Sequence, residues 1–205
     1  ILWSIKMFKP KTTTLSSNKV TLRPLTMEHL TDFFNAGAFP EIWTWSLPDK
    51  CSSIEATADW LAYSEQMTAK GEHAPFAIFD NDSKQFVGST RYCSIKAEDR
   101  SLEVGFTFIT PEFQRSYINT HAKYCLLKHA FEELGVIRVE FKTHENNNKS
   151  RKAIERLGAK FEGILRNQRI LSDGSYRNTA IFSIIATEWP TVKKTLQEKM
   201  DCVYD

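Results

Sequence analysis

The chain has 205 residues, of which 41% are apolar and 12% aromatic, and its 27 basic and 25 acidic residues give a net charge of +2. This composition supports one sizeable core and excludes a disordered tail protein, a collagen-like repeat and a coiled coil. The near-neutral charge argues against a dedicated nucleic-acid binder, and no apolar run approaches the roughly 20 residues that span a bilayer, so no membrane partner is expected.

We expect an extended, poorly packed lead-in over residues 1–19, one folded domain over 20–200 and a short tail over 201–205. The domain opens with alternating residues 20–24, which predict a strand. Thr26 can cap the helix that follows and runs to about Ala36.

Residues 39–49 are aromatic and contain two prolines, which predicts a loop or irregular turn. Ser52 and Glu55 have the spacing of a capping box, in which each side chain satisfies a backbone N–H of the first helical turn. The helix that they open is expected to end at Gly71. Its predicted buried face consists of Ile54, Ala58, Leu61 and Ala62.

The hydrophobic period then changes from 3.6 to 2 over residues 73–79, 85–92 and 101–109, which predicts an antiparallel meander. The rest of the chain alternates between helices and strands: helix 120–134, strand 136–142, helix 147–157, strands 161–171 and 176–186 joined by an Asp173-Gly174 turn, and helix 188–200. A strand–helix–strand unit after a meander requires a parallel pair inside a mixed sheet. We therefore predict a single α/β (α+β) domain with a mixed, mostly antiparallel sheet flanked by helices.

The junction between strand 101–109 and the next helix is a candidate anion site. Backbone N–H groups and the positive end of the helix dipole converge there, which suits a pyrophosphate. The loop Gln114-Arg-Ser-Tyr-Ile-Asn119 resembles the Q/R-x-x-G-x-G/A pyrophosphate loop of the GCN5-related N-acetyltransferases (GNAT). The later segments Val139–Thr143, Ala153–Ala159 and Glu162–Arg166 are similar to the RimJ/RimL-like branch of that family.

This resemblance implies a sheet splayed around acetyl-CoA and transfer of an acetyl group to a primary amine by direct attack, through a tetrahedral intermediate. The acceptor would be a protein N-terminus or a small molecule. The cofactor-binding residues that it implies are Phe108, Ile109, Thr110, Gln114, Arg115, Ser116, Tyr117, Ile118, Asn119, Thr120, Asn147 and Ser150.

The loop departs from the family pattern because Tyr117 and Asn119 stand where glycine is usual. Glycine allows close backbone approach and positive φ, which tyrosine adopts poorly. We expect Tyr117 to be helical with its ring turned away; the alternative is weakened cofactor binding. Arg115 can add a contact to phosphate or can be a solvated surface residue.

Acetyl transfer needs a group that takes a proton from the amine and a donor for the leaving thiolate. By resemblance Glu103 is the candidate base, beside Gly105, where a bulge can splay the strand; the alternative is a carboxylate on the wet face of a strand. The tyrosine acid of many relatives would fall near Ile154, so Ser150 is the candidate relay. Asn147 matches a cofactor-contacting asparagine and can also cap its helix.

Trp43 and Trp45 can line the acceptor pocket, although aromatic residues in such a loop more often serve packing. Arg166 and Arg169 can meet an acidic acceptor or lie on a solvated strand face. Nothing in the sequence fixes the oligomeric state, so a homodimer is kept open.

The four cysteines form no CxxC pair and indicate reduced thiols of a cytoplasmic protein. His121, His129 and His144 lack ligand spacing, so we expect them at the surface or at helix caps and expect no metal. Two other functions stay open. One is a non-catalytic acyl-CoA-binding or regulatory module, because of the missing glycines and tyrosine. The other is a ribosome- or RNA-associated protein, because of a pI of about 8.3.

Overall fold

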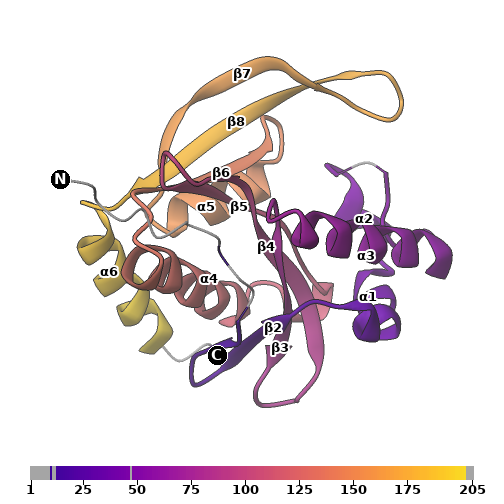
Figure 1. The fold of residues 1–205 in the computed structure, drawn as a ribbon, viewed down its shortest axis with the longest axis horizontal. Helices are drawn as coiled ribbons and strands as arrows, with labels where there is room; N and C mark the ends of the chain where they lie inside the picture. Colours follow the sequence, from indigo (N-terminus) through magenta and orange to yellow (C-terminus); the bar gives the residue numbers. More distant parts are fainter. Residues whose placement is uncertain (1–9, 11–12, 47, 202–205) are drawn as a thin grey trace.

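A mixed sheet organises the computed structural model, which describes residues 10, 13–46 and 48–201 (Figure 1). In this part of the chain the strand order is β1-β2-β3-β4-β5-β6-β8-β7, and neighbours are antiparallel except for the parallel pair β5–β6. The strands are β1 (Leu15–Ser16), β2 (Val20–Pro24), β3 (Ala74–Asp80), β4 (Phe86–Lys96), β5 (Ser101–Ile109), β6 (Arg138–His144), β7 (Lys160–Ile170) and β8 (Tyr176–Ile185). The predicted fold class, including its parallel pair, is confirmed.

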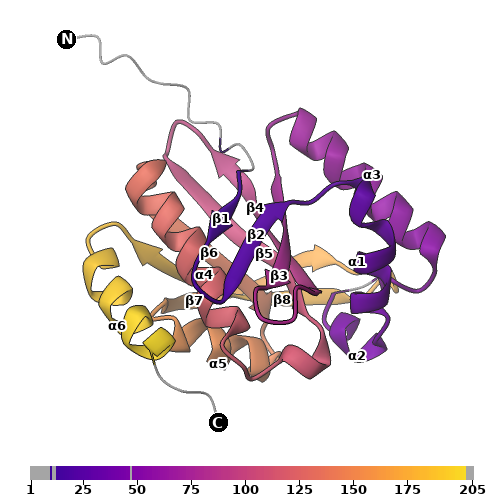
Figure 2. The same cartoon turned by 90° about the horizontal axis from the view of Figure 1, so that it is seen from below.

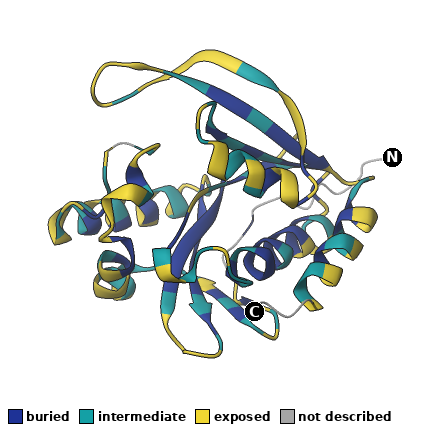
Figure 3. Ribbon diagram, turned by 180° about the vertical axis from the view of Figure 1, so that it is seen from behind, coloured by how far each residue is buried: buried dark blue, intermediate teal, exposed yellow. Residues whose placement is uncertain are grey.

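Helices cover both faces of the sheet, α4, α5 and α6 on one and α1, α2 and α3 on the other (Figures 1 and 2). They are α1 (Leu30–Gly37), α2 (Pro40–Trp43), α3 (Ile54–Ala69), α4 (Ile118–Lys128), α5 (Asn148–Arg156) and α6 (Trp189–Asp201), with short turns of 3-10 helix at Met27–His29 and Pro111–Phe113 and of π-helix at His129–Glu133. The main core lies under α4, α5 and α6, and a smaller one lies under α1, α2 and α3. Figure 3 shows buried residues concentrated in the central strands and on the inner sides of the helices.

Strands β5 and β6 part after a short paired stretch. Residues 101–103 pair with residues 138–140, and in the part of the chain that the structure describes the ladder goes no further. On the other edge of β5, the register against β4 shifts between Ser89 and Arg91, and Phe106 there adopts a φ of +49°. A bulge of this kind bends its strand. The fork between β5 and β6 therefore opens directly beyond Glu103, as the bulge near Gly105 predicts.

Helix α3 begins one residue later than predicted. Ser53, not Ser52, is the N-cap, and its hydroxyl accepts from the Ala56 N–H at 3.1 Å, while Ser52 donates to the preceding turn. The expected buried face was also wrong. Only Leu61 of the predicted residues is buried, together with the polar Thr57, which donates to the Lys50 carbonyl at 3.0 Å, and Ser64, which accepts from Arg91 of β4 at 3.0 Å.

The ends of the folded region also differ from expectation. Strand β1 lies inside the predicted lead-in, and Leu15 is buried in the main core. Within that lead-in, residues 1–9 and 11–12 lie outside the described residues, as does the predicted tail beyond Asp201. Within the aromatic loop 39–49, four residues form the short helix α2, with a proline at its first position, where a missing N–H costs nothing.

Candidate active site

Side-chain hydrogen bonds of Thr110 and Gln114 anchor the loop between β5 and α4. Thr110 donates to the carbonyl oxygens of Ala36 and Val87, at 3.1 and 3.2 Å, and the Gln114 amide donates to the Ile109 carbonyl at 2.8 Å. The left-handed residue of the loop is Arg115, with a φ of +62°. The unusual backbone geometry therefore falls on Arg115 and not on either position where the family has glycine.

Tyr117 has the conformation that we predicted. Its φ of −66° and ψ of −20° are right-handed helical. Its hydroxyl donates to Asp80 at 2.8 Å, and its ring packs at the edge of the main core, with the Lys19 ammonium 5.5 Å from the ring centroid. The side chain thus points toward the turn between β3 and β4, so the missing glycine introduces no backbone strain here.

The backbone around Arg115 and Ser116 fits an anionic ligand. Among the described residues, the N–H groups of these two residues donate no hydrogen bond, and the first turn of α4 carries no acidic residue. Ser116 instead uses its hydroxyl to hold the loop, donating to Phe113 and accepting from Ile118. The Lys149 ammonium binds the Gln114 side chain at the loop's edge. Free amides, a helix N-terminus and nearby cations suit a pyrophosphate.

The strand-end residues assigned to the cofactor by resemblance use their side chains for packing. The Phe108 ring lies 5.0 Å from the Phe33 ring and 5.4 Å from the Trp43 ring, and Ile109 is buried in the main core. Ile118 is fully buried as well. What Phe108 and Ile109 can offer a ligand is the backbone along the edge of β5 that does not pair with β6.

Glu103 lies at the point where β5 and β6 part, on the face of the sheet opposite Leu102 and Val104. Its Oε2 accepts from the Lys142 ammonium at 2.9 Å and from the Ser94 hydroxyl at 3.1 Å. Its Oε1 has no hydrogen bond within the described residues and would lie 2.9 Å from a Cβ added at Gly105. Burial lowers the pKa of Lys142, but the Glu103 and Glu140 carboxylates outweigh it and raise the pKa overall, so Lys142 remains protonated.

Asn147 and Ser150 lie at the start of α5, which packs on the other face of the sheet. Asn147 is the N-cap of α5, and its side-chain oxygen accepts from the Ser150 N–H at 3.0 Å, so its capping role is confirmed. Ser150 is half-buried, one turn before the buried Ile154. Glu103 and α5, which carries Ser150, therefore lie on opposite faces of the sheet.

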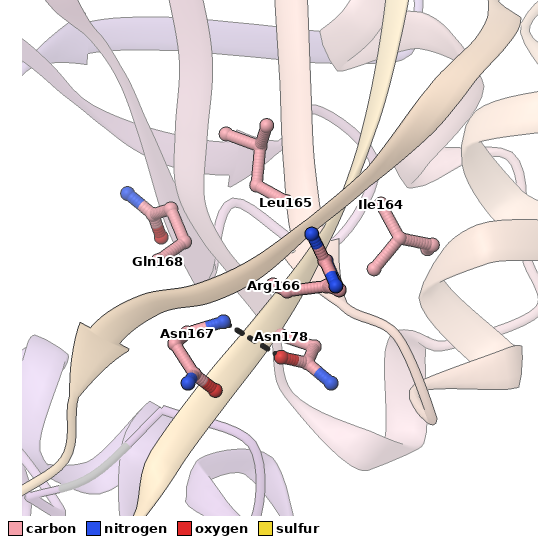
Figure 4. A pocket seen from close by; sticks show the side chains of 6 residues that line it. All are labelled: Ile164, Leu165, Arg166, Asn167, Gln168 and Asn178. Atoms are coloured by element: carbon pink, nitrogen blue, oxygen red, sulfur yellow. Dashed lines mark hydrogen bonds between the residues drawn. The ribbon is translucent and has the colours of Figure 1, made fainter.

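The three candidate acceptor residues lie in different settings. Trp43 is buried and donates from its indole to the Gly37 carbonyl at 2.8 Å. Trp45 is exposed, and its ring lies 4.7 Å from that of His144 on β6. Arg166 borders an open hollow of about 690 Å³ along β7 and β8 (Figure 4). The hollow is lined by Ile164, Leu165, Arg166, Asn167, Gln168 and Asn178.

Sequence reasoning passed over two charged residues on the face of the sheet that carries Glu103. Lys142 pairs with it directly, whereas Arg91, 1% exposed on the same face of β4, is paired in the ladder with Gly105 and hydrogen-bonds to Ser64 and His73. Alternation along β6 places Lys142 on the same face as Glu140, but the pairing of Glu140 with Glu103 depends on the register of β5 against β6. Nothing in the local sequence marks Arg91 as buried.

Two of the three histidines are buried. His121 is buried, not at the surface, and binds the Ser17 hydroxyl at 3.0 Å. His129 is at the C-cap position of α4, one of the two settings that we expected, and its buried side chain binds the Tyr92 hydroxyl at 3.2 Å. In the described ranges there is no group of three His, Cys, Asp or Glu residues that could hold a metal ion. Nor does any helix of those ranges have the length and apolar character needed to cross a membrane.

The sheet that forks beyond Glu103 and the free amides at the start of α4 are compatible with an acyl-CoA fold, and similarity to known proteins shows the family. A family profile described as "Acetyltransferase (GNAT) domain" matches residues 19–160. The chain therefore belongs to the GNAT acetyltransferase family and is an acyltransferase.

Three similar proteins illustrate this relationship. A GCN5-related N-acetyltransferase from Brucella melitensis superposes with a TM-score of 0.87 at 28% identity, covering 94% of this chain and 87% of that one. The uncharacterized N-acetyltransferase YoaA of Bacillus subtilis (strain 168) is 21% identical over 171 residues, 83% of this chain and 96% of its own. Mycobacterium smegmatis RimJ, solved in complex with CoA-disulfide, shares the fold with a TM-score of 0.77 at 20% identity, covering 93% and 95% of the two chains.

Proposed function

We propose that the chain is an acetyl-CoA-dependent N-acetyltransferase that acetylates a primary amine of a peptide N-terminus or a small molecule by direct attack. The observation that carries this proposal is the position of Glu103. It stands where β5 and β6 separate, with one carboxylate oxygen bound by Lys142 and Ser94 and the other unbonded within the described residues. A proton acceptor at the opening of an acyl-CoA fork is what amine acetylation needs.

The residues that would hold acetyl-CoA are those of the β5–α4 loop. The free N–H groups of Arg115 and Ser116, together with the Arg115 guanidinium, are suited to its pyrophosphate, and Asn147 lies at the start of the facing helix. The bound cofactor would supply an activated acetyl thioester. The RimJ neighbour in complex with CoA-disulfide supports a CoA-type ligand for this fold.

Glu103 would take the proton that the attacking amine must lose, through Oε1, either directly or through a water molecule. Lys142 and Ser94 hold Oε2 and so fix the direction of Oε1. Gly105 leaves the space in front of this oxygen open, since a side chain there would meet it. In this scheme Lys142 is a positioning residue.

Ser150 would complete the proton transfer on the other side of the fork. Its hydroxyl is the candidate donor toward the leaving thiolate. The backbone of Ser150 is held by the Asn147 cap, whose side-chain oxygen accepts from the Ser150 N–H at 3.0 Å. A hydroxyl is a weak acid, so its part is a hydrogen bond or a relay through water. The buried free thiols Cys51, Cys93 and Cys125 support a reducing, cytoplasmic setting.

Two measurements on the same protein test this proposal: thermal unfolding with acetyl-CoA and amine-dependent release of CoA. Acetyl-CoA should raise the midpoint of thermal unfolding, because a ligand of the native state stabilises it by mass action. CoA release, followed with a thiol reagent over a panel of amines, should then exceed the rate without amine. A midpoint shift without amine-dependent CoA release would instead support the non-catalytic acyl-CoA-binding module. No shift and no release would contradict the proposal outright.

A further inference from the structure

Cationic side chains from four segments gather on the face of the sheet that carries Glu103. They are Lys50, just before α3, Arg91 on β4, Arg169 on β7 and Arg177 on β8. Burial, then Arg169, and to a smaller extent Arg91, lower the pKa of Lys50, and the adjacent Asp49 offsets this only in part. None of the four forms a salt bridge with any residue that the structure describes.

Arg169 and Arg177 stand directly opposite each other in the β7–β8 ladder. The register shifts between Leu165 and Arg169, and Asn167, with a φ of +50°, is tied by its N–H to the Asn178 side chain at 2.8 Å (Figure 4). Like charges at paired positions destabilise a sheet. The bulge nevertheless brings the two guanidinium groups together, and the buried Nε of Arg177 has no hydrogen-bond partner among the described residues.

Arg91 is buried beneath these arginines, and its guanidinium forms no ion pair with a carboxylate among the described residues. Its guanidinium carbon lies 4.4 Å from the Trp60 ring centroid and 4.9 Å from that of Phe106. Its Nη atoms donate to Ser64 and His73, both at 3.0 Å. Burial and Arg91 lower the pKa of His73 to about 4, so this partner stays neutral. The Lys50 ammonium lies 5.1 Å from the same Trp60 ring.

The carboxylates nearest the candidate base are ion-paired to other cations. Lys142 binds both Glu103 and Glu140, at 2.9 and 3.0 Å, and Arg138 also binds Glu140 at 3.0 Å, so none of these ion pairs involves Lys50, Arg91, Arg169 or Arg177. Burial and the charge of Arg169 lower the pKa of Arg177, whereas the carboxylate of Glu103 raises it. Glu103 is therefore close enough to Arg177 to act on it, and the cluster lies beside the candidate base. The hairpin that carries Arg169 and Arg177 reaches toward the segment before α3 (Figure 1).

From this arrangement we infer that the acceptor carries an anionic group, a carboxylate or phosphate a few bonds from its reactive amine, which Lys50, Arg169 and Arg177 bind. The inference rests on the proposed function and names the acceptor class of the same site. Arg91, being buried, acts through its field and by fixing Trp60. An anion held by the three exposed or half-exposed cations would relieve their mutual repulsion and would place the amine near Glu103.

The test compares acceptors that differ in charge alone. Peptides with Asp and Glu after the N-terminal residue are paired with Asn and Gln versions, and phosphoethanolamine is paired with ethanolamine, which distinguishes a peptide carboxylate from a small phosphate. With acetyl-CoA, kcat/KM should favour the anionic member of at least one pair by about tenfold or more. The double variant Arg169→Gln/Arg177→Gln should lose that preference, because its kcat/KM should fall about tenfold more with the anionic member than with the neutral one.

Lys194→Gln, on the exposed side of α6, is the control for net charge and should keep the preference. Equal rates with charged and neutral members, or equal losses with both in the double variant, would overturn the inference and leave the acetyltransferase proposal intact. If no amine releases CoA, the proposed function fails, and calorimetric binding of the N-acetylated acidic peptide still decides the inference. Binding that the double variant weakens about tenfold supports it, and no binding, or equal binding by both proteins, refutes it.

Discussion

Lys123, a buried lysine on α4, should make the free energy of unfolding depend on pH. Lys123 is 5% exposed, and its ammonium bonds only to hydroxyls within the described residues, Thr107 at 2.6 Å and Thr90 at 3.1 Å. Burial lowers its pKa from 10.5 to about 7, although Cys93 opposes the shift slightly. At about 1.4 kcal/mol per pH unit, this shift penalises the charged form by about 5 kcal/mol.

The sign of the pH dependence follows from the direction of this shift. Above pH 10.5 the amine is neutral in both folded and unfolded chains, so burial carries no charge penalty. As the pH falls toward 7 the unfolded chain binds the proton first, and the free energy of unfolding decreases; below about pH 7 this contribution is constant. Lys123→Met keeps the side-chain volume and leaves Thr90 and Thr107 hydrogen-bonded to each other at 2.7 Å.

We therefore expect Lys123→Met to be stabilising at pH 7, and its advantage over the wild type to shrink by about 2–3 kcal/mol at pH 9. The assay is urea unfolding of both proteins at the two pH values, with Lys128→Met as control, since Lys128 is exposed on the same helix. A stability difference that is the same at both pH values would refute the reasoning, because it would mean that the buried amine does not titrate in this range.

Three further predictions concern the fork. Gly105→Ala should lower kcat by about tenfold or more and leave the Kd for acetyl-CoA unchanged, because its Cβ would lie 2.9 Å from the Glu103 Oε1; an unchanged kcat would show that this oxygen has no part in turnover. Tyr117→Phe should cost about 1 kcal/mol of stability in urea unfolding through the lost bond to Asp80, with no change in calorimetric acetyl-CoA binding; a weaker Kd would mean that the ring faces the ligand. Ser150→Ala should reduce kcat several-fold with no effect on acetyl-CoA affinity, and equal kcat values in stopped assays would remove Ser150 from the mechanism.

The sequence predicted those features that depend on local pattern and on chain order. Alternation identified the strands of the meander, and a helix between β5 and β6 required a parallel pair, which places a fork beyond Glu103. The helical conformation of Tyr117 was predicted because a tyrosine avoids the left-handed geometry that glycine would allow, and the positive φ falls instead on Arg115.

Features set by contacts between distant segments could not be predicted in this way. The buried face of α3 was assigned to apolar residues, whereas Ser64 faces the sheet because it accepts from Arg91 on β4. The ion pair between Lys142 and Glu103 depends on the register of β5 against β6. The Arg169–Arg177 pair depends on a bulge in β7, for which the strand's alternation gives no signal.

The central claim, that Glu103 acts as the base of an amine acetyltransferase, is tested most directly by Glu103→Gln. CoA release from acetyl-CoA with the best amine of the panel should fall at least about a hundredfold, while the calorimetric Kd for acetyl-CoA stays within about twofold of the wild type. Glu98→Gln, an exposed residue of the β4–β5 turn, removes the same charge and should keep full turnover. Wild-type turnover in Glu103→Gln would contradict the account.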